Sequence, residues 1–147
     1  MKIYNTYSRQ LEDFQPIEPG KVKMYVCGPT VYNYIHVGNA RSVVAFDLVR
    51  KYLEFRGFEV QYISNFTDVD DKIINGAKAA NMTTTDFSER YIAAFYEDTD
   101  ALNVKRASQN PKATEFIEAM IEFIQELVDK EFAYVKNDLF VLNVANA

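Results

Sequence analysis

The stretch that decides the fold is CGPTVYNYIHVGNARS, Cys27–Ser42. It contains the only cysteine and the only histidine among the 147 residues of the chain. Its glycines and its proline are typical of tight turns. Because so many special residue types fall within one short loop, the segments on either side of it determine what the loop is for.

The segment before this loop has the period of a strand. Apolar side chains alternate with lysines and a tyrosine along Lys21–Gly28, KVKMYVCG. A period of two predicts a strand with one buried face. Gly28-Pro29 closes the segment with a strong turn signal.

The segment after the loop has the period of a helix, from about Asn39 to Arg56. Its apolar residues recur three and four positions apart, at Val43, Phe46, Val49, Tyr52 and Leu53. Gly57 then stands where a helix end favours positive φ. Phe58–Phe66, FEVQYISNF, is rich in β-branched and aromatic residues and predicts a second strand. Strand, helix and strand predict a βαβ unit, and parallel sheets bind ligands at the carboxyl ends of their strands.

The remainder of the chain is predicted to be mostly helical. A short helix covers DDKIINGAKAAN, and Thr83 with Asp86 fits a capping box for the next one. Asn110-Pro111 fits the N-cap and N1 positions of a third helix. That helix carries an apolar stripe made of Phe116, Met120, Phe123, Ile124 and Leu127. The tail predicts a hairpin that turns at residues 136–138. We find no linker, so we expect a single α/β domain over residues 1–147.

Composition excludes several classes of protein. No apolar run approaches ~18 residues, so no membrane span is expected. The first residues lack the apolar core of a signal peptide. One cysteine forms no internal disulfide, which favours a cytoplasmic protein. A net charge of −5 argues against a surface that binds nucleic acid over its whole extent.

His36 has two interpretations. A lone histidine often caps a helix or fills a half-buried site. Here it also lies between a strand and a helix N-terminus, where free N–H groups and the helix dipole favour an anion. Gly38 leaves the backbone open to a flat ring or a phosphate, and Asn39 can face the same ligand as His36. A nucleotide is the natural candidate, although the pattern is neither GxGxxG nor a P-loop.

The residues around His36 resemble those of a known protein family. HVGN, after GPTVYNYI, resembles the HIGH signature of class I aminoacyl-tRNA synthetases. The segments MYVCGPTVYNYIHVGNARS and YISNFTDVDDKI together are similar to the cysteinyl-tRNA synthetase family. The likeness runs from about Met1 to Tyr134 and covers the first part of that family's catalytic domain. It implies a truncated Rossmann-like (HUP-type) nucleotide-binding fold, with additional helices, a C-terminal hairpin and a connective-peptide insertion beginning near 111–147.

The resemblance also implies roles for individual residues. His36 and Asn39 would stabilise charge on ATP during adenylate formation. Asn39 stands where the signature often has a second histidine; its amide donates a hydrogen bond but carries no charge. The implied ATP site, for ATP with Mg²⁺, is Pro29, His36, Gly38 and Asn39. The implied cysteine site is Thr30, Thr67 and Asp68, and Cys27 would be one of four zinc ligands. Asp70 and Asp71 also suit Mg²⁺, but a helix start explains them.

Zinc would serve substrate selection in such an enzyme. Cysteine and serine are near-isosteres, and a simple pocket separates isosteres poorly. Zinc prefers a thiolate to a hydroxyl, so direct coordination would select cysteine. The implied reaction is attack of the cysteine carboxylate on the α-phosphate of ATP, followed by transfer of the acyl group to tRNA(Cys).

The resemblance leaves three functions open. In the family the other zinc ligands, the KMSKS loop and the anticodon-reading domain lie downstream, so we expect the chain to lack them. It is the N-terminal catalytic part of a cysteine–tRNA ligase, or of a related enzyme that joins cysteine to an amino sugar in thiol-cofactor synthesis. Alternatively it is a catalytically inactive module that binds a nucleotide or a partner. A lone cysteine at a strand end is also an ordinary buried apolar residue.

Overall fold

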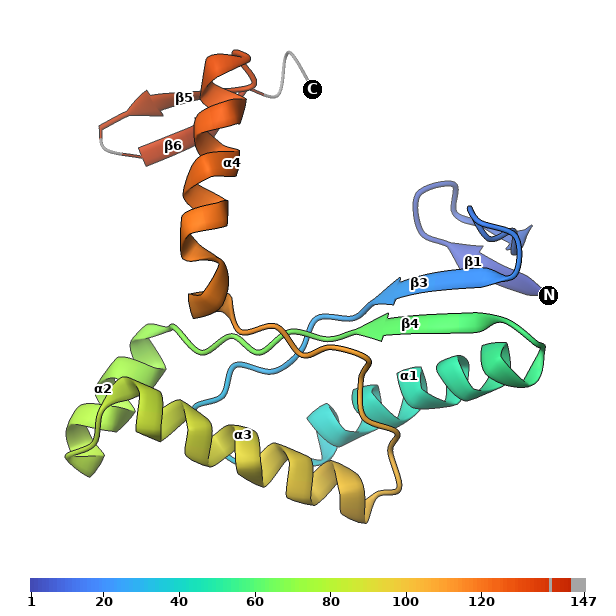
Figure 1. Cartoon of the computed structure of the whole chain (residues 1–147), viewed down its shortest axis with the longest axis horizontal. Coiled ribbons are helices and arrows are strands. Elements are labelled where there is room, and N and C mark those ends of the chain that lie inside the picture. The colour runs from blue at the N-terminus through green and yellow to red at the C-terminus, as the bar shows by residue number, and fades with distance from the viewer. Residues whose placement is uncertain (138, 144–147) are drawn as a thin grey trace.

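The computed structural model describes residues 1–137 and 139–143 (Figure 1). Its strands are β1 (Lys2–Asn5), β2 (Gln10–Asp13), β3 (Lys21–Tyr25), β4 (Glu59–Ile63), β5 (Ala133–Lys136) and β6 (Leu139–Leu142). Its helices are α1 (Val37–Phe55), α2 (Asp71–Ala80), α3 (Thr84–Ala101), the 3-10 turn η1 (Ala113–Phe116) and α4 (Ile117–Asp129). In Figure 1 the helices α1, α2 and α3 lie along one side of the β3–β4 pair, while α4 and the β5–β6 hairpin stand away from it.

The predicted βαβ unit is confirmed. β3 and β4 pair in parallel, with Val22 opposite Val60 and Tyr25 opposite Ile63, and α1 connects them. Val22 is buried at 8 % exposure whereas the lysines on either side of it are exposed, as the alternation predicts. The unit therefore brings the loops after β3 and after β4 to the same end of the sheet.

A third extended segment continues this sheet and corrects the prediction for Asn110-Pro111. Residues 109–112 run parallel to the chain after β4, with bridges from Ile63 to Gln109 and from Phe66 to Lys112. The Phe66 N–H donates to the Pro111 carbonyl at 2.8 Å. Asn110 caps no helix, because its amide donates to the Ser64 carbonyl at 2.6 Å and its Oδ1 accepts from the Tyr96 hydroxyl at 3.0 Å. The following helix begins only at η1 and α4.

The core lies where the loop after β3, the chain after β4 and two helices meet. Its buried apolar members are Val31, Phe66, Ile73, Ala77, Phe87 and Ile92. The Phe66 ring meets those of Phe95 and Tyr96 edge to face, at centroid distances of 5.3 and 5.6 Å. α2 and α3 thus pack against the chain that follows β4. The predicted caps are also present, since Asp70 caps α2 and Thr83 caps α3.

The helix predicted after the loop is present, but its predicted apolar stripe is buried only in part. Leu53 is 2 % exposed, as the spacing predicts. Phe46, Val49 and Tyr52 keep 39 %, 41 % and 43 % of their surface exposed. Asp47 and Arg50 are instead buried, at 6 % and 4 % exposure. The reason is a segment of chain after α3 that covers the polar side of α1 and satisfies its charges.

The C-terminal hairpin is confirmed as an antiparallel pair, β5 with β6. Asn137 adopts φ 51° at its turn, and Asp138 lies outside the described residues. An N-terminal hairpin, β1 with β2, precedes the sheet and has no counterpart among the sequence predictions. Among residues 1–137 and 139–143, no helix combines the length and the apolar character that a membrane crossing needs.

Candidate functional site

The loops after β3 and β4 join directly at the carboxyl end of the sheet. The Val31 N–H donates to the Thr67 carbonyl and the Thr67 N–H donates to the Pro29 carbonyl, each at 3.1 Å. Thr30 and Thr67 form an isolated parallel bridge. Three of the residues predicted from the family resemblance are thus brought together, from positions more than thirty residues apart in the sequence.

Asn65 links the two loops, and sequence reasoning did not select it. Its Oδ1 accepts from the Gly28 N–H and from the Tyr25 hydroxyl, each at 3.0 Å. Its amide donates to the Thr67 hydroxyl at 3.3 Å. A Cβ on Gly28 would lie 1.7 Å from the Asn65 carbonyl oxygen, so only glycine fits at that position. One asparagine therefore holds the strand end that carries Cys27 against the strand end that carries Thr67.

His36 and Asn39 form a reciprocal cap at the start of α1. The Gly38 N–H donates to His36 Nδ1 at 2.9 Å, and the His36 N–H donates to Asn39 Oδ1 at 3.3 Å. The helix-capping interpretation of His36 is therefore present in the structure. The cap also determines which ring nitrogen of His36 carries the proton. Because Nδ1 accepts, the neutral imidazole carries its proton on Nε2, which remains a donor.

Gly38 gives the cap its room. A Cβ there would lie 2.7 Å from His36 Cε1 and 2.9 Å from His36 Nδ1. The flat ring that approaches this backbone is therefore that of His36 itself. The glycine keeps the first turn of α1 accessible, because any side chain would displace the cap.

Asp68 and Cys27 occupy different surroundings. The Asp68 carboxylate is buried at 8 % exposure and accepts from Thr114 twice, from its N–H at 3.0 Å and from its hydroxyl at 2.5 Å. It ties the chain after β4 to the turn before α4, so its role toward a substrate stays a prediction. Cys27 is exposed as a free thiol, which argues against the buried apolar role.

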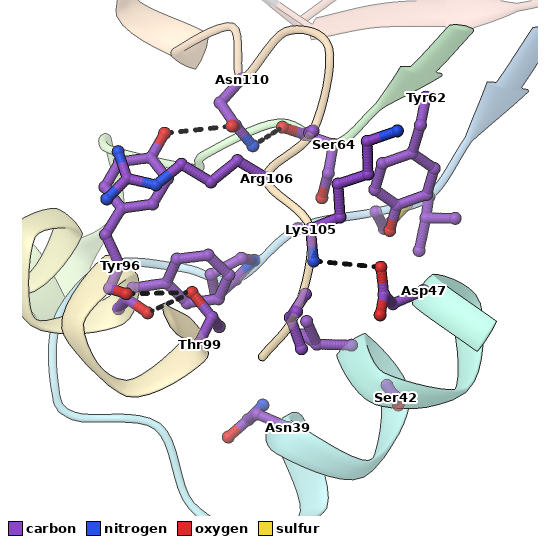
Figure 2. A pocket seen from close by; sticks show the side chains of 18 of the residues that line it. Asn39, Ser42, Asp47, Tyr62, Ser64, Tyr96, Thr99, Lys105, Arg106 and Asn110 are labelled. Carbon is purple, nitrogen blue, oxygen red and sulfur yellow. Dashed lines mark hydrogen bonds between the residues drawn. The ribbon is translucent and has the colours of Figure 1, made fainter. Parts of the chain in front are cut away.

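A cavity of about 200 Å³ opens beside these loops (Figure 2). Pockets for drug-sized ligands span about 300–1,000 Å³, so this one suits part of a nucleotide or an amino acid. Among its lining residues are four of those predicted from the sequence, Cys27, Pro29, Gly38 and Asn39. Its lining does not include the other four, His36, Thr30, Thr67 and Asp68. Figure 2 shows Asn39 and Ser42 of α1 at one side.

The opposite wall comes from residues that sequence reasoning missed. It consists of α3 with Phe95, Tyr96 and Thr99, and of the segment Val104–Ala107. The Arg106 guanidinium lies over the Tyr96 ring, 4.4 Å from its centroid. Burial raises the pKa of the Tyr96 hydroxyl above its usual value, so it stays a proton donor to Asn110.

The described residues do not fit a zinc site by themselves. A closed site takes about four ligands from cysteine, histidine and carboxylates. Within residues 1–137 and 139–143, no three such side chains gather closely enough to hold a metal. Cys27 offers one thiolate, and His36 is engaged in the helix cap through Nδ1.

Comparison with known families agrees with this geometry. Residues 13–146 match the family described as tRNA synthetases class I (C) catalytic domain. The chain belongs to this family. The family match agrees with the parallel strands of the βαβ unit and confirms the predicted Rossmann-like α/β fold class.

Curated relatives of this class I synthetase domain include several cysteine–tRNA ligases. That of Lactococcus lactis subsp. cremoris strain MG1363 is 82 % identical over all 147 residues, which are 33 % of the relative. That of Latilactobacillus sakei strain 23K is 58 % identical over 141 residues, covering 95 % of this chain and 30 % of the relative. The chain thus spans about a third of the length of these relatives.

Solved structures agree on the fold. The methionyl-tRNA synthetase of Mycobacterium tuberculosis, in complex with methionyl-adenylate, superposes with a TM-score of 0.70 at 19 % identity. The match covers 78 % of this chain and 23 % of that one. At this identity the likeness establishes a shared fold for the class I synthetase domain.

Proposed function

We propose that this chain is the N-terminal part of the catalytic domain of a cysteine–tRNA ligase. The reaction is ATP-dependent formation of cysteinyl-adenylate, followed by transfer of the cysteinyl group to tRNA(Cys). The observation that carries the proposal is the junction of the loops after β3 and β4 beside the N-terminus of α1. The similarity to curated cysteine–tRNA ligases over the whole chain supports the choice of substrate.

The N-terminus of α1 binds the phosphates of ATP in this proposal. Its first N–H groups and the helix dipole attract an anion. His36 Nε2–H is a donor because Nδ1 is fixed as the acceptor from Gly38. Asn39 uses its Oδ1 in the cap, which leaves its NH₂ group to donate. Two donors thus remain to stabilise charge that develops as the α-phosphate is attacked.

The junction of the two loops holds the cysteine substrate. Thr30 and Thr67 face one another across the parallel bridge, at the same sheet end as Cys27. In the whole enzyme, Cys27 would be one ligand of zinc, which when bound would distinguish a thiol from a hydroxyl. Because no three such side chains gather within residues 1–137 and 139–143, the remaining ligands would come from outside these residues.

A pair of substitutions at His36 tests the phosphate site. His36→Ser keeps a good N-cap, whereas His36→Ala removes the cap and costs about 1 kcal/mol of folding free energy. Both remove the Nε2 donor. We expect both variants to bind ATP at least tenfold more weakly by titration calorimetry, and only His36→Ala to lower the unfolding midpoint. Unchanged ATP affinity in the folded His36→Ser variant would contradict the proposed role.

The reaction itself is tested by adding the part of a relative that this chain does not span. The chain is mixed with the remaining two thirds of the Lactococcus lactis ligase, and cysteine-dependent exchange between ATP and pyrophosphate is measured. Exchange that depends on both parts supports a cysteine-activating enzyme. Attachment of cysteine to tRNA(Cys) selects the tRNA ligase over the enzyme of thiol-cofactor synthesis.

A second candidate is a module that binds a nucleotide without catalysis. The observation in its favour is the lack of a metal-holding group within residues 1–137 and 139–143. It predicts ATP binding by the chain alone and no exchange in the mixture. Exchange in the mixture would exclude it.

A further inference from the structure

A stripe of charged residues on α1 faces the segment after α3. Asp47, Arg50, Lys51 and Glu54 recur at the three- and four-residue spacing of one helix face. Asp47 and Arg50 are buried at 6 % and 4 % exposure, which is rare for charged side chains unless they are paired. We call this set of four residues the charged stripe.

Asp47 holds the backbone of the segment at two points. Its Oδ1 accepts from the Lys105 N–H at 3.1 Å, as Figure 2 shows. Its Oδ2 pairs with Lys51 Nζ at 2.6 Å, and the same ammonium donates to the Asn103 carbonyl at 2.9 Å. The carboxylate thus acts on residue 105 directly and on residue 103 through Lys51.

Arg50, one turn further along α1, also binds the segment after α3. Its guanidinium donates to the Arg106 carbonyl at 2.6 Å and to Glu54 Oε1 at 3.1 Å. It also lies over the Tyr62 ring, 5.4 Å from the centroid. The charged stripe therefore binds main-chain groups of residues 103–106. It leaves the side chains of Val104 and Arg106 to line the cavity.

We propose that Asp47 is a positioning residue for the ligand cavity. It fixes the wall Val104–Ala107 at a set distance from Asn39 and Ser42 at the start of α1. Asp47 is the member of the stripe that both lines the cavity and accepts a main-chain N–H of that wall. A ligand bound between the two sides then meets a preformed site and need not order the segment itself. The inference rests on the proposed function, with ATP as the ligand.

Three variants separate positioning from general stability. Asp47→Ala removes the acceptor for Lys105 and the partner of Lys51. Asp47→Asn keeps an acceptor oxygen for the Lys105 N–H. Leu48→Ala is the matched control, since Leu48 is the next residue of the same helix and is 68 % exposed. ATP affinity is measured by calorimetry at a temperature where circular dichroism shows each variant to be folded.

The expected result is a graded loss of affinity. Asp47→Ala should weaken ATP binding about tenfold, Asp47→Asn less than threefold, and Leu48→Ala not at all, following the cost of ordering a loosened wall. Hydrogen exchange at the Lys105 amide should accelerate in the same order. A purely structural role would lower the unfolding midpoint and leave the affinity of the folded variants unchanged, which overturns the inference.

Two further outcomes are decided in the same experiment. If Asp47→Ala does not fold, Lys51→Ala replaces it, since that change frees the Asn103 carbonyl and leaves Asp47 in place. Weaker ATP binding by Lys51→Ala then supports the inference, and unchanged binding overturns it. If the unaltered chain itself binds no ATP, the proposed nucleotide site is overturned. If the unaltered chain and Asp47→Ala bind equally, only the positioning role is overturned.

Discussion

Single side chains in this protein hold separate segments of the candidate site together by hydrogen bonds. Asn65 accepts from the Gly28 N–H, directly after Cys27, and donates to Thr67, so one side chain joins the two loops at the candidate site. His36 closes the first turn of α1 through Nδ1 and keeps its other nitrogen as a donor. In both cases one side chain fixes the main chain of a loop at the candidate site.

Gly76 is required at its position because a side chain there would clash with the core. A Cβ there would lie 2.4 Å from Cζ of the buried Phe87 ring. Gly76→Ala gains up to about 1 kcal/mol in helix propensity. The clash costs about 1–3 kcal/mol in a packed core. We expect a net loss of up to about 2 kcal/mol in the free energy of unfolding, measured with urea.

The matched variant for this prediction is Gly76→Ala combined with Phe87→Leu. A smaller side chain at 87 relieves the clash, so the double variant should lose less stability than the two single losses added together. Strict additivity of the two changes would show that the contact between residues 76 and 87 is not the cause.

At the scale of elements, two segments take roles that their own patterns do not indicate. α1 buries charged residues because the segment after α3 offers main-chain partners to them. Residues 109–112 extend the sheet because Asn110 binds the Ser64 carbonyl. Each element depends on a partner that lies more than forty residues away in the sequence.

Asn110 anchors the third extended segment to the sheet and to α3. Asn110→Ala leaves the half-buried Tyr96 hydroxyl and the Ser64 carbonyl without this partner, and an unpaired buried group costs about 1–3 kcal/mol. We expect a loss of roughly 2–3 kcal/mol in the free energy of unfolding. A double-mutant cycle with Tyr96→Phe should give a coupling of about 1 kcal/mol, and zero coupling would contradict the observed hydrogen bond.

Glu54 links α1 to the segment in a pH-dependent way. The hydrogen bond from Lys105, and then that from Arg50, hold the pKa of its carboxyl below the usual value. A lowered folded-state pKa contributes stability above the unfolded pKa of about 4.3, and that stability is lost as the pH falls through the folded-state pKa. The melting temperature should therefore fall less steeply in Glu54→Gln than in the unaltered chain between about pH 5 and about pH 3. Glu97→Gln, at an exposed position of α3, is the control and should leave the fall unchanged.

At the scale of the whole molecule, the chain spans about a third of the length of the curated relatives it matches. Large apolar side chains of α4 and the hairpin are exposed, among them Phe123 at 61 % and Leu139 at 66 %. Figure 1 shows these elements standing away from the helices of the sheet. The loops at the sheet end are held by hydrogen bonds, whereas apolar side chains of α4 and the hairpin are exposed.

Zinc content tests the metal proposal at this scale. Because the described residues offer one thiolate and no gathered set of ligands, the purified chain should hold far less than one zinc per molecule after mild chelation. Elemental analysis measures this, with Cys27→Ser as the control. A stoichiometric amount that is lost in Cys27→Ser would instead show that a second chain completes the site.

The sequence by itself determined the βαβ unit, the caps of α2 and α3 and the C-terminal hairpin. These follow from local periodicity and turn chemistry, which act between residues close along the chain. It also brought forward Cys27, Pro29, Gly38 and Asn39, which line one cavity. The motif that holds them is a continuous loop between a strand and a helix.

Only the tertiary structure decided which face of α1 is buried, where residues 109–112 run and what forms the far wall of the cavity. The apolar spacing of α1 predicts a helix equally well whichever side is covered. A charged residue such as Asp47 becomes a core residue only when a distant N–H, here that of Lys105, satisfies it. The physical reason is that burying a charge depends on a partner in space, and a local pattern contains no information about that partner.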